Sequence, residues 1–436
     1  MTTFIQVPVK LSRFLAAVAL LAAAAGADES NPPRRQASAN IRYIRPTGSG
    51  DRSGIDLKNA AAFSEINAMI GLVGPGGKVC LLSDSGPYAT TDPITISHGG
   101  ADGRSVTITG IDGNGAPAKA RITGTRTNPF PTSAAVFAVM KAGTDVFRLG
   151  AGADHLTFSF LDFQNIGNGA FNVRAKIAGL ALEDIVATNV QRFLERTADV
   201  DSTITGLTIR RVSVMGFSKS AVRLDHNTSK VLMEDVLGDS LRQDFDNFAE
   251  GIDLSGNVHD VVFRRCTMRN SRQTLAPDVF WNGDGFTTEK NTYNILFEDC
   301  TASGNSDAGF DLKSSHVTLL RCRSFDNTAN FKLWGREKAV MRECVSENPL
   351  SHGGVQGARH VTAPWGANIL VENCTFTDGN ARAIVFHTDA NDDVKPPVGS
   401  IIAVTHSSVK SAGKLSFVDF NSKVVIEGIE RPFDGR

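Results

Sequence analysis

The sequence has no excess of charge of either sign. Its 45 Lys and Arg residues are balanced by 46 Asp and Glu residues, so the formal net charge is −1. Without a strongly basic surface, the chain as a whole has no electrostatic reason to bind nucleic acid or another polyanion. Affinity for an acidic polymer must then come from a local basic cluster or from a bound metal ion.

A hydrophobic run long enough to span a membrane is also lacking. The apolar run at residues 14–25 has 12 residues, whereas a membrane-spanning helix needs about 20. Lys10 and Arg13 precede this run and small residues follow it up to Ala27, which is the pattern of a signal peptide over residues 1–27. A buried N-terminal helix is the alternative. We therefore expect an exported protein, secreted or periplasmic, with no membrane attachment.

No linker divides the remainder, so residues 28–436 are expected to form one domain; a solenoid can reach this length as a single unit. The acidic, proline-containing stretch at residues 389–398 is expected to be a surface loop.

The cysteines are not spaced as disulfide partners usually are. Of six cysteines, five each follow an aliphatic residue at a distance of five positions, namely Cys266, Cys300, Cys322, Cys344 and Cys374. Such regular spacing favours an interior stack of reduced thiols over disulfide pairs.

The same five-residue frame continues towards the N-terminus without cysteine. It occurs nine times at intervals of 22 to 34 residues, and its opening positions are Leu156, Leu180, Leu207, Val231, Val261, Ile295, Val317, Ala339 and Ile369. Another apolar residue follows each opening position after two residues, as Phe263 follows Val261. This alternation is typical of a strand with one face inward, followed by an outward step and a second inward strand.

Nine stacked units of this kind predict an all-β solenoid, the right-handed parallel β-helix. A leucine-rich repeat is the alternative, because it also places aliphatic residues near Asn or Cys. Its period is tighter, however, and it carries a helical segment on one side. Here the second half of each repeat is strand-like, as in residues 309–312, and the variable intervals suit loops on a rigid β-helix.

An N-terminal cap is expected over about residues 40–90. Residues 41–44 have the pattern of a strand. The stretch from Leu57 to Leu72 is amphipathic and predicts a helix with Phe63, Ile66 and Ile70 on its apolar face. Such a helix would cover the unpaired strand edge at the open end of the solenoid.

Charged residues are expected to gather on the outward face of one strand per coil. Aligning these strands by their apolar residues gives a column of outward residues, Arg223, Asp253, Thr287, Asp311 and Lys332. Neighbours in such a column lie about 4.8 Å apart. Glu250, Asp284 and Asp307 stand close before it. Clustered carboxylates repel one another unless something neutralises them, and two interpretations remain: a surface neutralised by Arg and Lys, or a calcium site.

Three motifs on consecutive coils resemble those of family-nine polysaccharide lyases, which include calcium-dependent pectate lyases. They are Asp284-Gly285-Phe286, the segment from Asn305 to Leu312, and the segment from Asn330 to Gly335. In the family these run roughly D-G-F, N-x-D-D-G-W-D-L and G-F-K-L-G. The resemblance covers about 50 residues closely and the region from Tyr43 to Tyr88 loosely.

The resemblance implies calcium ligands at Asp284, Asp307 and Asp311 and a catalytic base at Lys332. The chain departs from the pattern at Ala308, where the family has a second aspartate; Asp253 or Glu250 can supply the missing oxygen. The implied reaction is β-elimination in an acidic, pectate-like polysaccharide, with Ca²⁺ as the cofactor.

Further residues are candidates for binding the polysaccharide. Trp334, Trp281 and Trp365 can stack on sugar rings or simply pack, and Arg223 and Arg336 can pair with substrate carboxylates. We expect a monomer. Two other functions stay open: a β-helix glycosidase using the carboxylates of Asp253 and Asp311, and a non-catalytic carbohydrate-binding adhesin.

Overall fold

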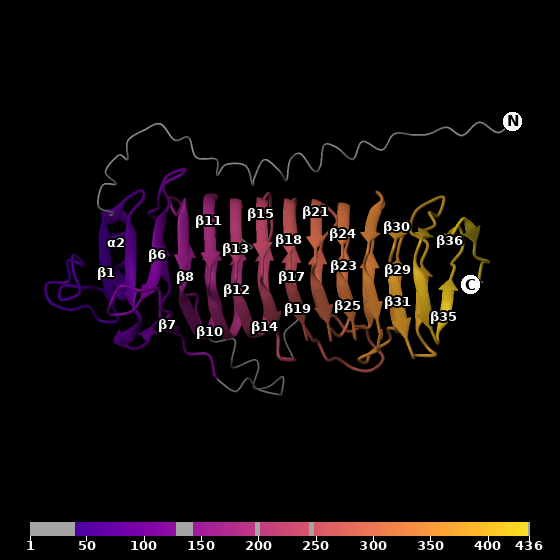
Figure 1. Ribbon diagram of the computed structural model, residues 1–436, viewed down its shortest axis with the longest axis horizontal. Coiled ribbons are helices and arrows are strands. Elements are labelled where there is room, and N and C mark those ends of the chain that lie inside the picture. The colour runs from indigo at the N-terminus through magenta and orange to yellow at the C-terminus, as the bar shows by residue number, and fades with distance from the viewer. Residues whose placement is uncertain (1–39, 128–142, 197–200, 244–247, 435–436) are drawn as a thin grey trace. The chain divides into compact units, whose positions relative to one another are not determined.

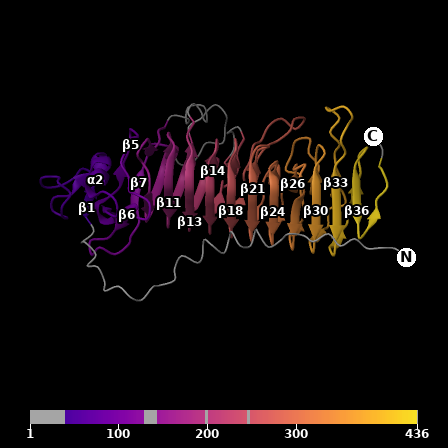
Figure 2. The ribbon, with the colours of Figure 1, turned by 90° about the horizontal axis from the view of Figure 1, so that it is seen from above.

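Short parallel strands joined by turns make up almost all of the secondary structure. The computed structural model describes residues 40–127, 143–196, 201–243 and 248–434; the expected signal peptide lies outside these ranges. From residue 250 to residue 411, each coil contributes one strand to each of three faces, as β20 (Asp284–Thr288), β21 (Tyr293–Glu298) and β22 (Thr301–Ser303) do. Strands of successive coils lie side by side (Figures 1 and 2).

The first face is a sheet of 16 strands within the described residues, all parallel except for its last pair. In spatial order these strands are β2 (Ala61–Ala62), β1 (Ile41–Arg45), β3 (Lys78–Leu82), β6 (Val106–Ile111), β9 (Leu156–Ser159), β11 (Ile177–Glu183), β13 (Ile204–Arg210), β15 (Ser229–Glu234), β18 (His259–Arg264), β21, β24 (Ser315–Leu320), β27 (Ala339–Arg342), β30 (Asn368–Glu372), β33 (Ile401–Thr405), β36 (Lys423–Ile426) and β37 (Ile429–Glu430).

The remaining strands form the other two faces. Three long strands, β10 (Leu161–Val173), β12 (Val186–Arg196) and β14 (Ser213–Leu224), run through both of them. One face then continues with β16 (Leu237–Asp239), β19 (Thr267–Arg269), β22, β25 (Arg323–Phe325), β28 (Val345–Glu347), β31 (Thr375–Asp378) and β34 (Ser408–Ser411). The other, which we call the site sheet, continues with β17 (Glu250–Leu254), β20, β23 (Ala308–Leu312), β26 (Ala329–Leu333), β29 (Arg359–Ala363), β32 (Ile384–Thr388) and β35 (Lys414–Phe417). At the N-terminal end, β4 (Tyr88–Ala89), β5 (Ile94–Ile96), β7 (Ala120–Thr123) and β8 (Phe147–Leu149) begin these two faces.

The fold is therefore a right-handed parallel β-helix, as predicted. The aliphatic frame is in register from coil to coil; Leu180 lies opposite Leu207, and Val261 lies opposite Ile295. In the described coils the second half of each repeat is strand, so the leucine-rich alternative is wrong. The five frame cysteines are buried free thiols, which confirms their interior position. Aromatic residues stack in the same way, with the rings of Phe286 and Phe310 4.9 Å apart.

The amphipathic segment near the N-terminus forms a shorter helix than expected. A 3-10 turn, Phe63–Glu65, leads into α2 (Ile66–Val73), whose buried residues pack against β1, β2, β3 and β5. The preceding residues cannot be helical because the Asp56 carboxylate accepts two backbone N–H bonds in a local turn, and Ala61–Ala62 pairs with β1 as a strand. Among the described residues, no helix is long and apolar enough to cross a membrane.

Opposite charges alternate along the outer surface of the 16-stranded sheet. Arg210, Glu234, Arg264, Glu298 and Arg321 come from successive coils, and each neighbouring pair is joined by an ion pair of 2.8 to 3.5 Å. This row shows how the fold balances charge where no ligand is involved, and it provides a comparison for the site sheet.

Candidate active site

The site sheet carries the column of outward residues that the sequence predicts. Arg223 lies opposite Asp253, Asp253 opposite Thr287, and Thr287 opposite Asp311. Lys332 on β26 follows directly opposite Asp311. The column forms because the flanking positions of each strand are buried, as Phe310 and Leu312 are, and side chains alternate along a strand, so the residue between them faces outward.

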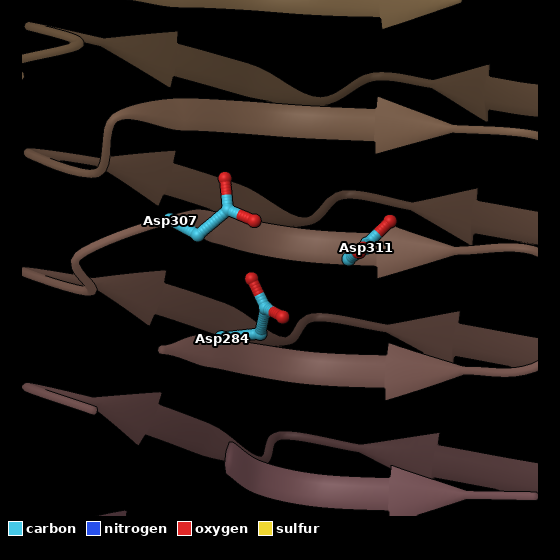
Figure 3. A group of neighbouring side chains, drawn as sticks. All are labelled: Asp284, Asp307 and Asp311. Atoms are coloured by element: carbon cyan, nitrogen blue, oxygen red, sulfur yellow. The ribbon is translucent and has the colours of Figure 1, made fainter. Parts of the chain in front are cut away.

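Three aspartates meet on this sheet. Asp284 begins β20, Asp311 lies within β23, and Asp307 directly precedes β23. Their carboxylates project from the same side of two adjacent strands (Figure 3), and one oxygen of each lies within 4.8 Å of the others. All three are buried. We call these residues the acidic trio.

The register of β23 explains which residue completes the trio. Phe286 pairs with Phe310, so the position opposite Asp284 is Ala308, and Asp307 enters from the turn one residue earlier. The Ala308 backbone N–H donates to Asp284 Oδ1 at 2.7 Å, and Thr287 Oγ1 donates to Asp284 Oδ2 at 3.3 Å. These bonds fix the orientation of the Asp284 carboxylate.

Two lysines and a tryptophan surround the trio. Lys332 Nζ lies 3.0 Å from Asp307 Oδ2 and 3.6 Å from Asp311 Oδ2. Lys313 Nζ also lies 3.6 Å from Asp311 Oδ2, and the Trp334 indole N–H donates to Asp311 Oδ1. The sequence thus brings together Asp284, Asp307, Asp311 and Lys332 as expected, and the structure adds Lys313, which sequence reasoning missed although it follows the Asp311-Leu312 pair directly.

Burial and mutual repulsion govern the charges here. Burial, together with the neighbouring charges of Asp307 and Asp311, raises the pKa of Asp284 well above its ordinary value. Burial lowers the pKa of Lys332, but the carboxylates of Asp307 and Asp311 outweigh it, so the net pKa of Lys332 is raised. With the aspartates ionised and no cation bound, Lys332 is therefore an ammonium group that balances part of the negative charge.

The acidic trio fits a hard divalent cation. Its donors are all carboxylate oxygens, the ligand type that Ca²⁺ prefers, and two lysines leave the three carboxylates incompletely neutralised. Asp253, the fourth predicted ligand, lies two strands from Asp311 and outside this group. Its carboxylate instead pairs with Arg223 at 3.0 Å and accepts a bond from Ser255 Oγ at 2.8 Å.

The candidate binding residues line two hollows beside the trio. Arg223 and Asp253 line one of about 230 Å³ together with the buried carboxylate of Glu250. Trp334 and Arg336 line the other, of about 390 Å³, at the end of the site sheet strands. The two hollows are neighbours, because Glu289 of the first forms an ion pair of 2.8 Å with Lys313 of the second.

The other two tryptophans differ in their surroundings. Trp281 is buried, packs on the Gly353-Gly354 backbone and donates its N–H to the Ala276 carbonyl at 3.0 Å, so it holds a loop in place. That loop positions Phe280 beside Lys332, whose Nζ lies 5.0 Å from the ring centre. Trp365 is 43% exposed and lines the larger hollow with Trp334.

Comparisons with known proteins agree with this architecture. A sequence profile of the family described as "Right handed beta helix region" matches residues 199–395, just under half of the chain. The preneck appendage protein of Bacillus phage PZA is 27% identical over 172 residues, which cover 37% of this chain and 20% of that protein. The match thus spans about a fifth of the length of this relative.

Solved structures share the fold at low sequence identity. The pectate lyase Pel9A is 15% identical with a TM-score of 0.52, and the match covers 72% of this chain and 78% of the lyase. The catalytic domain of a GH87 α-1,3-glucanase variant in complex with nigerose is 10% identical with a TM-score of 0.52, covering 93% of this chain and 71% of that one. These similarities show the right-handed β-helix fold that the chain shares with both enzymes.

Proposed function

We propose that this protein is a polysaccharide lyase that cleaves an acidic, uronate-containing polysaccharide by calcium-assisted β-elimination, and that it belongs to the family-nine lyases its motifs resemble. The observation that carries the proposal is the acidic trio with Lys332 Nζ 3.0 Å from Asp307, on an outward sheet face. The β-helix fold, shared with a pectate lyase, supports it at the level of architecture.

In the proposed reaction, Asp284, Asp307 and Asp311 would hold Ca²⁺. When bound, the ion would neutralise the substrate carboxylate and stabilise the negative charge that develops beside it. Lys332 in its neutral form removes the proton from C5. The electron pair left on C5 forms the C4–C5 double bond as the C4–O bond breaks, and the leaving oxygen takes a proton from water. The product is an unsaturated uronate at a new chain end.

Lys332 can act as this base only after losing its own proton. Its pKa is raised by the charges of Asp307 and Asp311, so neutralisation of those charges on cation binding favours the free amine. Burial of Lys332 lowers its pKa, so once those charges are balanced the neutral form is favoured further. We also propose that the protein is exported, on the basis of the signal-peptide pattern in its sequence, and that it acts as a monomer.

The decisive experiment is a product assay on polygalacturonate and other acidic polysaccharides, with calcium or with EDTA. We expect the ultraviolet absorbance of the unsaturated product to rise in calcium only. Lys332→Ala should reduce the rate at least about a hundredfold, the usual contribution of a positioned base. The control is Lys338→Ala, an exposed lysine six residues further along, which should keep the wild-type rate. Near-full activity of Lys332→Ala would remove Lys332 from the mechanism.

A glycoside hydrolase is the second candidate, and one observation favours it. Burial raises the pKa of Asp253 above its ordinary value, which is the condition for a carboxylic general acid. Asp253 and Asp311, two strands apart at about 10 Å, lie near the separation of an inverting pair. New reducing ends without unsaturated product in the same assay would identify hydrolysis, and binding without any product would identify a carbohydrate-binding solenoid.

A further inference from the structure

The larger hollow on the site sheet is built by four successive coils. Its walls come from the turns that follow β20, β23, β26 and β29, which contribute Lys290, Lys313, Trp334 with Arg336, and Trp365 respectively. A volume of about 390 Å³ lies within the usual size range of ligand pockets. We call this hollow the tryptophan pocket.

Two indole rings form an aromatic corner in the tryptophan pocket. The rings of Trp334 and Trp365 meet edge to face, with centroids 5.5 Å apart and planes at 84°. The bond from the Trp334 indole to Asp311 holds the first ring, whereas Trp365 remains 43% exposed. An exposed large aromatic side chain in a concave site offers a flat apolar surface of the kind that a sugar ring covers.

Basic residues surround this corner. Lys290 Nζ lies 5.4 Å from the centre of the Trp365 ring, and Lys313 Nζ lies 5.8 Å from that of Trp334. Within the described part of the chain, neither Lys290 nor Arg336 has a carboxylate within 4 Å, although both are exposed. The one acidic residue of the pocket, Glu337, pairs with His316 at 2.8 Å.

The basic residues of the tryptophan pocket differ from those on the outer surface of the 16-stranded sheet. There, Arg264 and its neighbours are each matched by a glutamate on the next coil. In the tryptophan pocket, Lys290 and Arg336 have no such carboxylate partner among the residues that the structure describes, so the pocket has a surplus of positive charge beside the apolar faces of its tryptophans. This combination is complementary to a sugar ring that carries an anionic group.

Lys313 links the tryptophan pocket to the acidic trio. It lines the pocket and lies 3.6 Å from Asp311 Oδ2, while Trp334 contacts both regions. We propose that the tryptophan pocket is a separate subsite for an anionic sugar unit, adjacent to the unit at Lys332 in the same chain. The inference rests on the proposed function for the identity of the chain, but it requires no metal ion. The inference predicts that the sugar next to the one at Lys332 also carries an anionic group, either a carboxylate or a sulfate.

Binding in EDTA tests the subsite apart from catalysis. The probe is trigalacturonate, followed by tryptophan fluorescence and calorimetry, and its uncharged counterpart is the fully methyl-esterified trisaccharide. We expect the wild-type protein to bind trigalacturonate and to bind the ester at least about tenfold more weakly. A sulfated galactose trisaccharide, run in parallel, distinguishes sulfate from carboxylate as the preferred anion.

Variants locate the binding. Trp365→Ala, and Lys290→Ala combined with Arg336→Ala, should each raise the Kd for trigalacturonate at least about tenfold, whereas Lys338→Ala, which removes an exposed charge outside the pocket, should not. Equal binding of the charged and esterified probes, or binding that these variants leave unchanged, would overturn the subsite. Binding that obeys these expectations in a protein that produces no unsaturated sugar would instead keep the subsite and refute the lyase.

Discussion

Lys332 occupies the central position among the charged side chains of the site. Its ammonium group lies between Asp307 and Asp311, so a purely structural lysine at this position would serve to balance charge. Lys332→Arg separates the two roles because arginine keeps the charge but, with a pKa above about 12, gives up its proton far less readily. We expect Lys332→Arg to fold and bind oligogalacturonate, but to lose activity as severely as Lys332→Ala. Recovery of activity in the arginine variant would assign Lys332 to charge balance alone.

His360 belongs to a line of buried polar side chains that the sequence did not reveal. Its Nδ1 is 2.7 Å from Ser346 Oγ, and its Nε2 is 2.7 Å from Asp378 Oδ2. Asn330 donates to the same Ser346 hydroxyl at 2.9 Å. The residue types are those of a Ser-His-Asp triad, but the Ser346 and His360 side chains lie inside the solenoid, so the arrangement links coils rather than facing a substrate.

The stability of the protein should therefore depend on pH through His360. Burial lowers the pKa of this histidine below its ordinary value of 6.5. Below about pH 6.5 the unfolded chain takes up a proton that the folded protein does not, so stability is full above that pH and falls on acidification. We expect His360→Gln to be less stable at neutral pH but to lose stability less steeply, by up to about 1.4 kcal/mol per pH unit.

Denaturant unfolding at several pH values between about 5 and 7.5 measures this difference. His352, whose pKa burial also lowers, is unaltered in the variant and should leave a residual slope of the same sign. An identical slope in wild type and His360→Gln would mean that His360 titrates alike in the folded and unfolded states.

At the scale of elements, α2 covers the strand edge at the N-terminal end of the solenoid. Ile70 is fully buried against the strands, whereas Leu72, two residues further along the same helix, is 55% exposed. The pair provides a matched test of the cap. Ile70→Asp should lower the free energy of unfolding by at least about 3 kcal/mol, since it removes a buried side chain and buries a charge.

Leu72→Asp should change the free energy of unfolding by no more than about 0.5 kcal/mol. Urea unfolding compares the two variants, and light scattering reports association through the uncovered edge of β1 and β2, which we expect for Ile70→Asp only. Equal stability of the two variants would show that α2 contributes nothing to closing the solenoid.

At the scale of the whole molecule, calcium should stabilise the fold by mass action. A ligand that binds only the folded state at a hundred times its Kd adds about 2.7 kcal/mol to the free energy of unfolding. Tm should therefore rise with calcium concentration, and Asp284→Asn should abolish the rise. Asp260→Asn, which alters an exposed carboxylate distant from the trio in the sequence, is the control. A Tm that does not respond to calcium would favour neutralisation of the trio by Lys332 and Lys313 alone.

Much of the fold follows from spacing along the chain. The interval of five between Val261 and Cys266, repeated coil after coil, predicts stacked strands because inward positions alternate along a strand and identical coils place them above one another. The expected helix from Leu57 was too long for a local reason: the turn around Asp56 and the pairing of Ala61–Ala62 with β1 are not visible in hydrophobic periodicity.

For the candidate site, too, residue spacing predicts some features and not others. The sequence by itself determined that Asp284, Asp311 and Lys332 share one outward face, because strand alternation and coil register depend only on residue spacing. Only the tertiary structure decided what surrounds them: Asp253 is held by Arg223, Lys313 turns towards Asp311, and Trp365 meets Trp334 from the next coil. Those contacts depend on the conformation of the turns and on the direction of the side chains. Neither can be predicted from hydrophobic periodicity, because the turns between coils have irregular lengths.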